Sequence, residues 1–129
     1  MLLNHIINDL SLPRESIILG EAVLEFELNQ VCLVVTYEDL TKIDLSHALI
    51  VSPIDLFDSD LVLDYFESLA KDGKVDSLFL TGPDKEIKTT KIYELCSKYN
   101  LTLCCLGEDI SPIFAVNKIM KFYKEHMRQ

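Results

Sequence analysis

The chain has 129 residues, of which 49% are hydrophobic, and its 12 basic and 21 acidic residues give a formal net charge of −9. A chain of this length is expected to form one domain over residues 1–129, and its apolar content excludes the disordered class of protein. The acidic balance repels phosphate backbones, so we expect no direct contact between this chain and nucleic acid.

Cysteines, histidines and the first residues bear on metal binding and location. The four cysteines form no Cys-x-x-Cys pair, and the three histidines lie far from them in the sequence, which predicts no metal site. Such cysteines are typical of small buried residues in a reducing compartment. The first ten residues lack the basic segment of a signal peptide, and no apolar run approaches the roughly 20 residues of a membrane span. We therefore expect a cytoplasmic protein without membrane contact.

Periodicity in the first third of the chain predicts a helix followed by a pair of strands. Apolar residues recur at helical spacing over residues 2–10, and Pro13 stops that helix. Apolar residues alternate with glutamates over residues 24–28, as in a half-exposed strand, and residues 31–36 are expected to form the second strand. The polar residues 37–45 predict a short helix or loop.

A regular alternation of strands and helices begins at residue 47. The three strands are short and apolar, and they are expected at residues 47–52, 76–81 and 101–106. A helix is expected after each of them, which makes the order β-α-β-α-β-α in residues 47–127. Short apolar strands separated by helices are typical of a parallel sheet. The predicted class is therefore α/β: a single domain with a mainly parallel sheet, preceded by an N-terminal helix and a strand pair.

Capping residues predict where two of these helices begin and end. Ser59 or Asp58 can cap the start of the helix after the first regular strand, and Gly73 can supply its left-handed stop. The final helix is expected to start at Ser111-Pro112, with Ile113 among its core-facing residues.

Motifs of catalysis and cofactor binding are missing from the sequence. The four glycines form no Gly-x-Gly or Gly-x-x-x-x-Gly-Lys phosphate loop, and no Gly-x-Ser-x-Gly nucleophile turn occurs. His47 opens the first regular strand and Ser52 ends it, so we expect their side chains at opposite ends of that strand. We predict no catalytic residue, no cofactor and no enzymatic activity.

The ends of the three regular strands predict where a ligand would bind. In an open parallel sheet, crevices form beyond the C-terminal ends of the strands. The candidate ligand-binding residues at these ends are Ser52, Pro53, Thr81, Gly82, Glu108 and Asp109. The carboxylates among them favour a cationic or amino-bearing compound over a phosphate. The alternative is that these are ordinary loop residues, because acidic residues favour loops and helix N-termini.

Three stretches of the chain resemble one family of bacterial proteins. They are ALIVSPIDLF (48–57), LDYFESLAKDGKVDSLFLTG (63–82) and YELCSKYNLTLCCLGEDISPIFAVNKIM (93–120). From Ile17 to about Met120, the layout of strands, helices and turns resembles the N-terminal domain of PucR-type (purine catabolism regulator) transcription regulators. Ser52-Pro53 departs from the threonine-glycine turn that the family often has, and Thr102 stands where the family often has a proline.

The resemblance implies a regulatory domain of a transcription regulator, which senses a small-molecule effector or supports assembly. In such regulators a separate helix-turn-helix region binds DNA, and we see no such region here. The resemblance also implies a homodimer or larger homo-oligomer, for which Leu24, Phe26 and Leu28 offer an apolar strand edge unless they face the core. Two alternatives stay open: a protein-interaction scaffold, and a small enzyme with an acidic site at the C-terminal ends of the strands.

Overall fold

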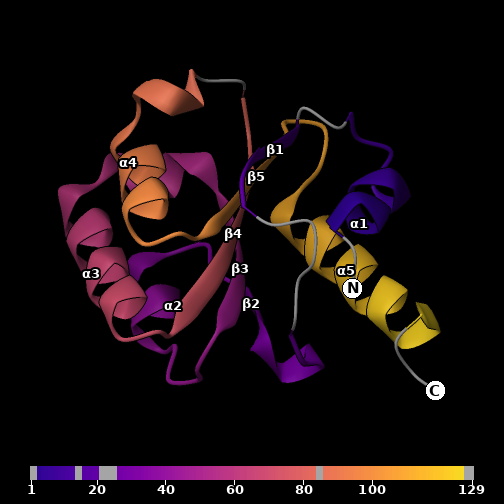
Figure 1. Cartoon of the computed structure of the whole chain (residues 1–129), viewed down its shortest axis with the longest axis horizontal. Helices are drawn as coiled ribbons and strands as arrows, with labels where there is room; N and C mark the ends of the chain where they lie inside the picture. Colours follow the sequence, from indigo (N-terminus) through magenta and orange to yellow (C-terminus); the bar gives the residue numbers. More distant parts are fainter. Residues whose placement is uncertain (1–2, 14–15, 21–25, 84–85, 127–129) are drawn as a thin grey trace.

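The computed structural model describes residues 3–13, 16–20, 26–83 and 86–126 of the chain (Figure 1). Its helices are α1 (Leu3–Asp9), α2 (Tyr37–Thr41), α3 (Asp60–Lys71), α4 (Lys91–Lys98) and α5 (Pro112–His126). Its strands are β1 (Ile17–Leu19), β2 (Val31–Leu33), β3 (Ala48–Pro53), β4 (Val75–Thr81) and β5 (Thr102–Gly107). Short 3-10 turns are η2 (Leu28–Gln30), η3 (Ile54–Asp58) and η4 (Ile87–Thr89).

The described strands form one five-stranded sheet in the order β1-β5-β4-β3-β2. Strands β2 to β5 run parallel, and each lies beside the next one in the sequence. β1 pairs antiparallel with β5 and forms one edge of the sheet, while β2 forms the other edge. The predicted α/β fold with a mainly parallel sheet is therefore confirmed. The three strands expected from residue 47 onward are β3, β4 and β5.

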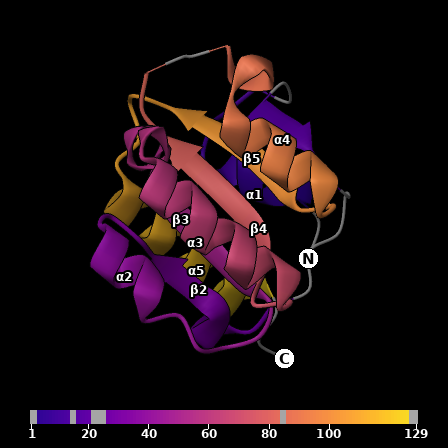
Figure 2. The ribbon, with the colours of Figure 1, turned by 90° about the vertical axis from the view of Figure 1, so that its left-hand side faces the viewer.

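Helices cover both faces of this sheet. Figures 1 and 2 show α2, α3 and α4 on one face and α1 with α5 on the other. The helices α2, α3 and α4 each connect two parallel strands that are neighbours in the sheet. When neighbouring parallel strands follow one another in sequence order and their crossover connections have the same handedness, the connecting helices lie on one face of the sheet. α5 follows the last strand and packs against β2 and β3 from the opposite face.

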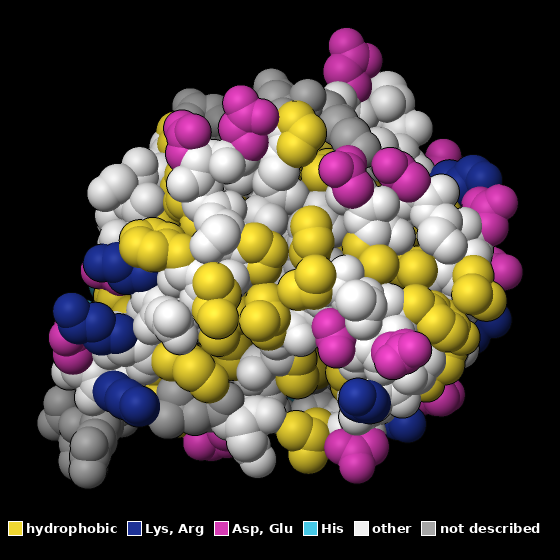
Figure 3. Space-filling view, turned by 180° about the vertical axis from the view of Figure 1, so that it is seen from behind, with side chains coloured by type: hydrophobic (Ala, Val, Ile, Leu, Met, Phe, Trp, Pro, Cys, Tyr) yellow, Lys and Arg dark blue, Asp and Glu magenta, His cyan; other side chains and the backbone are white. Residues whose placement is uncertain are grey.

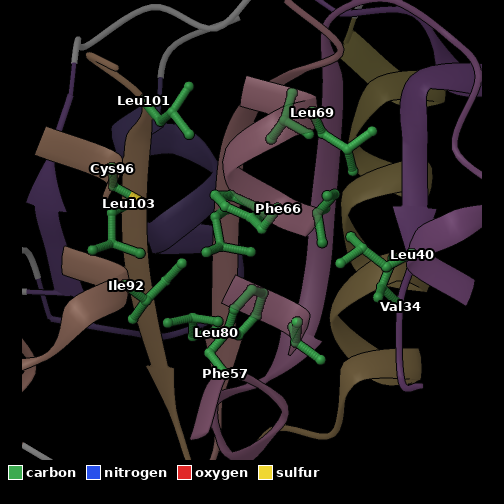
Figure 4. Packing of buried hydrophobic residues seen from close by; sticks show 14 of the residues in the cluster. Val34, Leu40, Phe57, Phe66, Leu69, Leu80, Ile92, Cys96, Leu101 and Leu103 are labelled. Atoms are coloured by element: carbon green, nitrogen blue, oxygen red, sulfur yellow. The ribbon is translucent and has the colours of Figure 1, made fainter. Parts of the chain in front are cut away.

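Each face of the sheet has its own hydrophobic cluster. Leu78 and Leu80 of β4 belong to the cluster under α2, α3 and α4, whereas Phe79 belongs to the cluster under α1 and α5. This alternation follows from the two-residue period of a strand. Phe66 of α3 is fully buried at the centre of the first cluster, where its ring meets Phe57 edge-on at a centroid distance of 5.3 Å (Figure 4).

The capping residues expected from the sequence take up their roles. Ser59 Oγ accepts a hydrogen bond from the Val62 N–H at 3.4 Å, so Ser59 rather than Asp58 caps α3. Gly73 has a φ of +71°, the left-handed conformation that stops a helix. At the start of α5, Ser111 Oγ accepts a hydrogen bond from the Phe114 N–H at 3.2 Å.

The N-terminal helix and strand pair expected from the sequence are present as α1, β1 and β2, but residues 26–28 of the strand expected over residues 24–28 form no strand. Leu24 lies outside the described residues, Phe26 and Glu27 belong to no strand, and η2 begins at Leu28. The first strand of the fold is β1, which precedes this segment. The ring of Phe26 instead packs against Tyr123 of α5, with centroids 5.6 Å apart. Tertiary contact with α5 thus overrides the local alternation of apolar residues and glutamates.

Ile113 is also misassigned, because its side chain is 59% exposed. The buried face of α5 is formed by Ala115, Val116, Ile119 and Phe122. At about 3.6 residues per turn, Ala115 and Phe122 fall on the opposite side of the helix from Ile113, while Val116 lies between Ile113 and the centre of the buried face. The apolar character of Ile113 therefore does not reflect packing within this domain.

Candidate functional site

A pocket of about 350 Å³ lies at the C-terminal ends of β4 and β5. It falls at the sheet edge where open parallel sheets place ligands. Its walls come from the segment between α1 and β1, from β1 itself, from η3 and η4, and from the two strand ends. The lining residues are Leu12, Pro13, Ser16, Ile18, Ile54, Leu80, Thr81, Gly82, Pro83, Ile87, Cys105, Leu106 and Gly107.

Two glycines shape the floor of the pocket where the strands end. The Gly82 N–H donates to the Gly107 carbonyl at 2.9 Å, which ties the end of β4 to the end of β5. Both glycines have positive φ, +122° for Gly82 and +85° for Gly107. A Cβ added to Gly82 would lie 2.9 Å from Ile54 Cγ2, so a side chain here would push against the wall formed by η3. Glycine at residue 82 therefore keeps η3 close to the strand ends.

Two hydroxyl groups are the main polar side chains of the lining. Thr81 ends β4 and is 4% exposed, and Ser16 lies just before β1 and is 8% exposed. The two residues come from parts of the chain that are distant in sequence. A hydroxyl can both donate and accept a hydrogen bond, so each can meet a polar group of either kind.

Of the six residues predicted from the strand ends, Thr81 and Gly82 line the pocket. Ser52 is fully buried at the end of β3, and its Oγ donates to the Pro53 carbonyl at 3.3 Å. Pro53 is half-buried and is not among the lining residues.

The acidic residues after β5 stand apart from the pocket. Glu108 and Asp109 are both exposed, and neither belongs to its lining. The structure thus brings together the end of β4 with the end of β5, and leaves the end of β3 and the acidic turn outside. The basis for expecting a cationic ligand, which was the presence of these two carboxylates, does not apply to this pocket.

Sequence reasoning missed the residues that come from the N-terminal side of the pocket. Ser16 and Ile18 reach it because β1 pairs antiparallel with β5. No periodic signal in residues 16–19 indicates a partner strand that lies so far along the chain. Cys105 was also missed, although its place could have been inferred: Cys104 and Cys105 face opposite sides of β5, as the two-residue strand period requires.

Most of the cysteine thiols are poor nucleophiles. Burial, followed by the effect of Cys105, raises the pKa of Cys96 to about 12, and burial also raises the pKa of Cys104. Burial and then the charge of Asp44 raise the pKa of Cys32. A thiol with a raised pKa holds little reactive thiolate at neutral pH. Cys105 is the half-buried thiol that lines the pocket.

His47 lies at the N-terminal end of β3, whereas the pocket lies at the C-terminal ends of β4 and β5. It immediately precedes β3, and its Nδ1 lies 3.0 Å from Asp76 Oδ2 at the start of β4. Both side chains are largely exposed. The prediction that His47 and Ser52 lie at opposite ends of the first regular strand is confirmed, and the pair with Asp76 is a surface contact.

Within the described part of the chain, no group of three or more His, Cys, Asp or Glu side chains is placed to hold a metal ion. Among the same residues, no helix has both the length and the apolar character needed to cross a membrane. Comparison of the chain with protein-family models, with curated proteins and with solved structures finds no match. The resemblance to PucR-type regulators therefore stays a prediction.

Proposed function

We propose that this chain is a cytoplasmic regulatory domain that senses a small molecule, of the kind found in PucR-like transcription regulators. The observation that carries the proposal is the pocket at the ends of β4 and β5, which combines apolar walls with the two hydroxyls of Ser16 and Thr81. Pockets that are mainly apolar, with a few polar groups to orient a ligand, are typical of small-molecule binding sites.

The chemistry of the lining favours binding over catalysis. General acid–base catalysis needs a histidine, carboxylate, lysine or similar group within hydrogen-bond reach of the substrate. Among the described lining residues, the groups able to form hydrogen bonds through their side chains are two hydroxyls and the Cys105 thiol, and none of these lining residues is a histidine, carboxylate or lysine. A ligand held here would be recognised without being converted, as a sensor requires.

The state of the cysteines supports a reducing compartment. Cys32, Cys96 and Cys104 form no disulfide, and Cys96 and Cys104 are fully buried. Proteins of oxidising compartments commonly use cysteines in disulfides, whereas cytoplasmic proteins keep them as buried thiols. This supports the cytoplasmic assignment.

A metabolite panel tests the sensing function. Each compound is added to the purified chain, the melting temperature is measured, and the compound is recovered and analysed by mass spectrometry. A ligand at ten times its Kd is expected to add about 1.4 kcal/mol of stability, or roughly 4 °C for a domain of this size. Recovery of the compound unchanged is the expected result. Conversion of a compound would contradict the sensing function and indicate an enzyme.

Two matched variants locate the binding. Cys105→Phe fills the pocket with a bulky side chain, and Cys32→Phe makes the same change at a half-buried cysteine of the opposite sheet edge. The stabilising compound is expected to raise the melting temperature of Cys32→Phe but not that of Cys105→Phe. If it stabilises both variants equally, the pocket is not the sensing site.

The reading frame that encodes the chain tests the regulator part of the proposal. The resemblance implies that a DNA-binding helix-turn-helix accompanies this domain in the same protein. Sequencing the full transcript is expected to find one, and a different partner domain would contradict the PucR-like assignment.

Self-assembly is a second candidate function, favoured by β2, which forms one edge of the sheet among the described strands. Leu33, Val35 and Leu45 there are 36%, 47% and 38% exposed, and Leu33 and Leu45 line a small hollow of about 250 Å³. Figure 3, which views the molecule from behind the view of Figure 1, shows hydrophobic side chains gathered on that face. Because an unpaired strand edge carries both donors and acceptors, it can pair with a second copy of itself about a two-fold axis.

Sedimentation velocity at high micromolar concentration tests this assembly. The wild-type chain is expected to sediment as a dimer, and Val35→Glu is expected to shift it to monomer, because charge at a strand edge blocks pairing. Leu61→Glu is the control, since Leu61 is 59% exposed on α3 and lies away from β2. If the wild-type chain sediments as a monomer, the proposal of self-assembly through β2 is contradicted.

A further inference from the structure

We propose that the assembly surface at β2 continues onto one flank of α5, so that a second copy of this chain joins its sheet edge to edge and packs its own α5 alongside. The two β2 strands pair antiparallel about a two-fold axis at Leu33, and Ile113 is the residue of α5 that meets the second copy. This inference rests on the self-assembly through β2 proposed above, and it adds the strand register and the helix contact.

The backbone of β2 turns the polar groups of Leu33 away from β3. The Val34 N–H donates to the Val51 carbonyl of β3 at 2.9 Å. Along a strand, the N–H and C=O groups of consecutive residues point to alternate sides, so those of Leu33 point outward. At a two-fold axis Leu33 lies opposite its own copy, and each Leu33 N–H can donate to the Leu33 carbonyl of the other chain.

Exposed side chains distinguish this register from its neighbour. Leu33 and Val35 are 36% and 47% exposed, whereas Val31 is 8% exposed. With Leu33 opposite itself, Val35 lies opposite Val31 of the second copy, so both exposed side chains join the contact. An axis at Cys32 would instead place Val35 opposite Asn29, which belongs to η2 rather than to the strand.

The position of α5 suits this pairing, because α5 packs against β2 and β3. Strands lie about 4.8 Å apart, so a helix above β2 and β3 has its axis about 2.4 Å inside β2, and edge-to-edge pairing sets two such axes about 10 Å apart. Packed helices have axes about 8–10 Å apart. A two-fold axis perpendicular to the sheet keeps both α5 helices on the same face, where they come into contact.

Contacts within the chain show which flank of α5 faces the β2 edge. Tyr123 marks this flank: its ring lies 5.6 Å from that of Phe26, and its hydroxyl donates to Glu27 at 3.0 Å, in the segment that leads into β2. Phe122 marks the other flank, since its ring lies 6.4 Å from that of His5 in α1. The two flanks of α5 therefore face different parts of the fold.

Ile113 and Phe114 fall on different flanks. At about 100° per residue, Ile113 lies about 80° from Tyr123 and about 180° from Phe122 around the helix. Phe114 lies about 80° from Phe122 and about 180° from Tyr123. Ile113, which is 59% exposed, is thus the apolar residue of the first turn that lies towards β2.

The surface beside β2 is apolar and carries charges of both signs. Figure 2 shows α2 and β2 on the side away from α4 and β5, and Figure 3 views the molecule from that side, where hydrophobic side chains gather. Lys42 and Asp44 line the hollow of about 250 Å³ that also includes Leu33. Each copy therefore offers the other a cation and an anion, which offsets part of the repulsion between two chains of net charge −9.

Ile113→Glu and Phe114→Glu form a matched pair that tests the helix contact. Each adds one negative charge at an exposed apolar residue in the first turn of α5. The Kd of the dimer is measured by sedimentation velocity over a series of concentrations. Ile113→Glu is expected to raise it at least about tenfold, because the new charge is buried at the contact. Phe114→Glu is expected to leave it within about twofold of the wild-type value.

The outcomes separate the helix contact from the assembly itself. If the two variants weaken the dimer equally, or neither does, the contact through α5 is overturned, while assembly through β2 stands as long as Val35→Glu gives monomer. Greater weakening by Phe114→Glu overturns the assignment of the flank. A wild-type chain that sediments as a monomer overturns both the contact and the assembly.

A disulfide tests the register. With the axis at Leu33, Cys32 lies opposite Val34 of the second copy in a pair whose Cα atoms are about 4.5 Å apart, within the range of a disulfide. Mild oxidation of Val34→Cys is expected to give dimers joined between residues 32 and 34, as peptide mass spectrometry would identify. The wild-type chain is expected to give no link between two Cys32 residues. Such a link would move the axis to Cys32 and overturn the register.

Leu33→Cys tests the same register at an exposed residue, in case the buried Val34→Cys side chain disturbs the fold. Leu33 lies opposite itself, with Cα atoms about 5.5 Å apart, so oxidation is expected to join two copies at residue 33. Absence of both links in variants that still sediment as dimers overturns the antiparallel pairing of β2.

Discussion

Phe66 shows how single residues hold the larger hydrophobic cluster together. Its ring is fully buried and meets Phe57 at an interplanar angle of 88°. Truncation of such a side chain removes the transferred surface and leaves a cavity that neighbours fill only in part. Because α3 contributes Phe66 to the cluster between the sheet and the layer of α2, α3 and α4, this ring links the helix layer to the sheet (Figure 4).

Phe66→Ala is therefore expected to lower the free energy of unfolding by about 3–5 kcal/mol, measured by urea titration. Phe114→Ala makes the same chemical change on the surface of α5, where the side chain is 48% exposed, and is expected to cost at most about 0.5 kcal/mol. Similar losses in the two variants would mean that Phe66 does not carry the packing described.

Gly82 and Gly73 separate two causes of glycine preference. Both have positive φ, but an added Cβ would meet Ile54 at 2.9 Å only at Gly82, and would meet nothing within 4 Å at Gly73. Gly73→Ala is expected to cost about 1–2 kcal/mol from the left-handed backbone alone, and Gly82→Ala more, because its φ of +122° is less accessible to a residue with a side chain and because contact with Ile54 adds to the cost. Thermal unfolding of the two variants measures the difference. A larger loss at Gly73 would contradict the close approach of η3.

At the scale of the element, α2 is held by a reciprocal cap. Thr36 Oγ1 accepts from the Asp39 N–H at 3.2 Å, and Asp39 Oδ2 accepts from the backbone N–H groups of Val35 and Thr36 at 3.0 and 3.1 Å. These bonds stabilise the ionised carboxylate and hold the pKa of Asp39 below its ordinary value of 3.8. A five-residue helix has few hydrogen bonds of its own, so its cap matters.

The cap predicts a dependence of stability on pH. Because the pKa of Asp39 is lower in the folded chain, its contribution is fully present above the unfolded value of 3.8 and is lost as the pH falls through the folded value. In Asp39→Asn, the difference in unfolding free energy between pH 6 and pH 3 is expected to shrink. Glu38→Gln, a neighbouring carboxylate outside the cap, is the control and should change this difference less.

Elements were predictable from the sequence where local periodicity and burial agree. β3, β4 and β5 are short apolar runs, and the stop at Gly73 and the cap at Ser59 are local signals, so their places follow from chemistry near them in the chain. Residues 26–28 of the strand expected over residues 24–28 form no strand, and the ring of Phe26 packs against Tyr123 of α5, a contact that no local pattern reveals.

The candidate site was predictable in part, for the same reason. Thr81 and Gly82 follow from the rule that ligands bind beyond the ends of parallel strands. Glu108 and Asp109 satisfy that rule in sequence, yet the chain turns them outward to water, where their charges are solvated at little cost. Ser16 and Ile18 depend on an antiparallel partner at the sheet edge, and such pairing is invisible to a reading of local patterns.

At the scale of the whole molecule, the net charge of −9 governs encounters with polyanions. The chain is expected to show no binding to a labelled 20-base-pair duplex at physiological salt up to about 100 µM, as followed by fluorescence anisotropy. Binding that weakens steeply as salt is raised would reveal a basic surface and contradict this expectation.

The connections between the strands also imply an order in which the sheet forms during folding. β2, β3 and β4 each pair with the next strand along the chain, so these contacts close short loops. β1 is the exception, since Ile17 lies opposite Cys104 and their pairing must close about two thirds of the chain. The entropic cost of closing a loop grows with its length, and contacts between residues distant in sequence form slowly. The parallel sheet can thus assemble before β1 docks, and the pocket, which needs Ser16 and Ile18 as one wall, comes into being only with that last step.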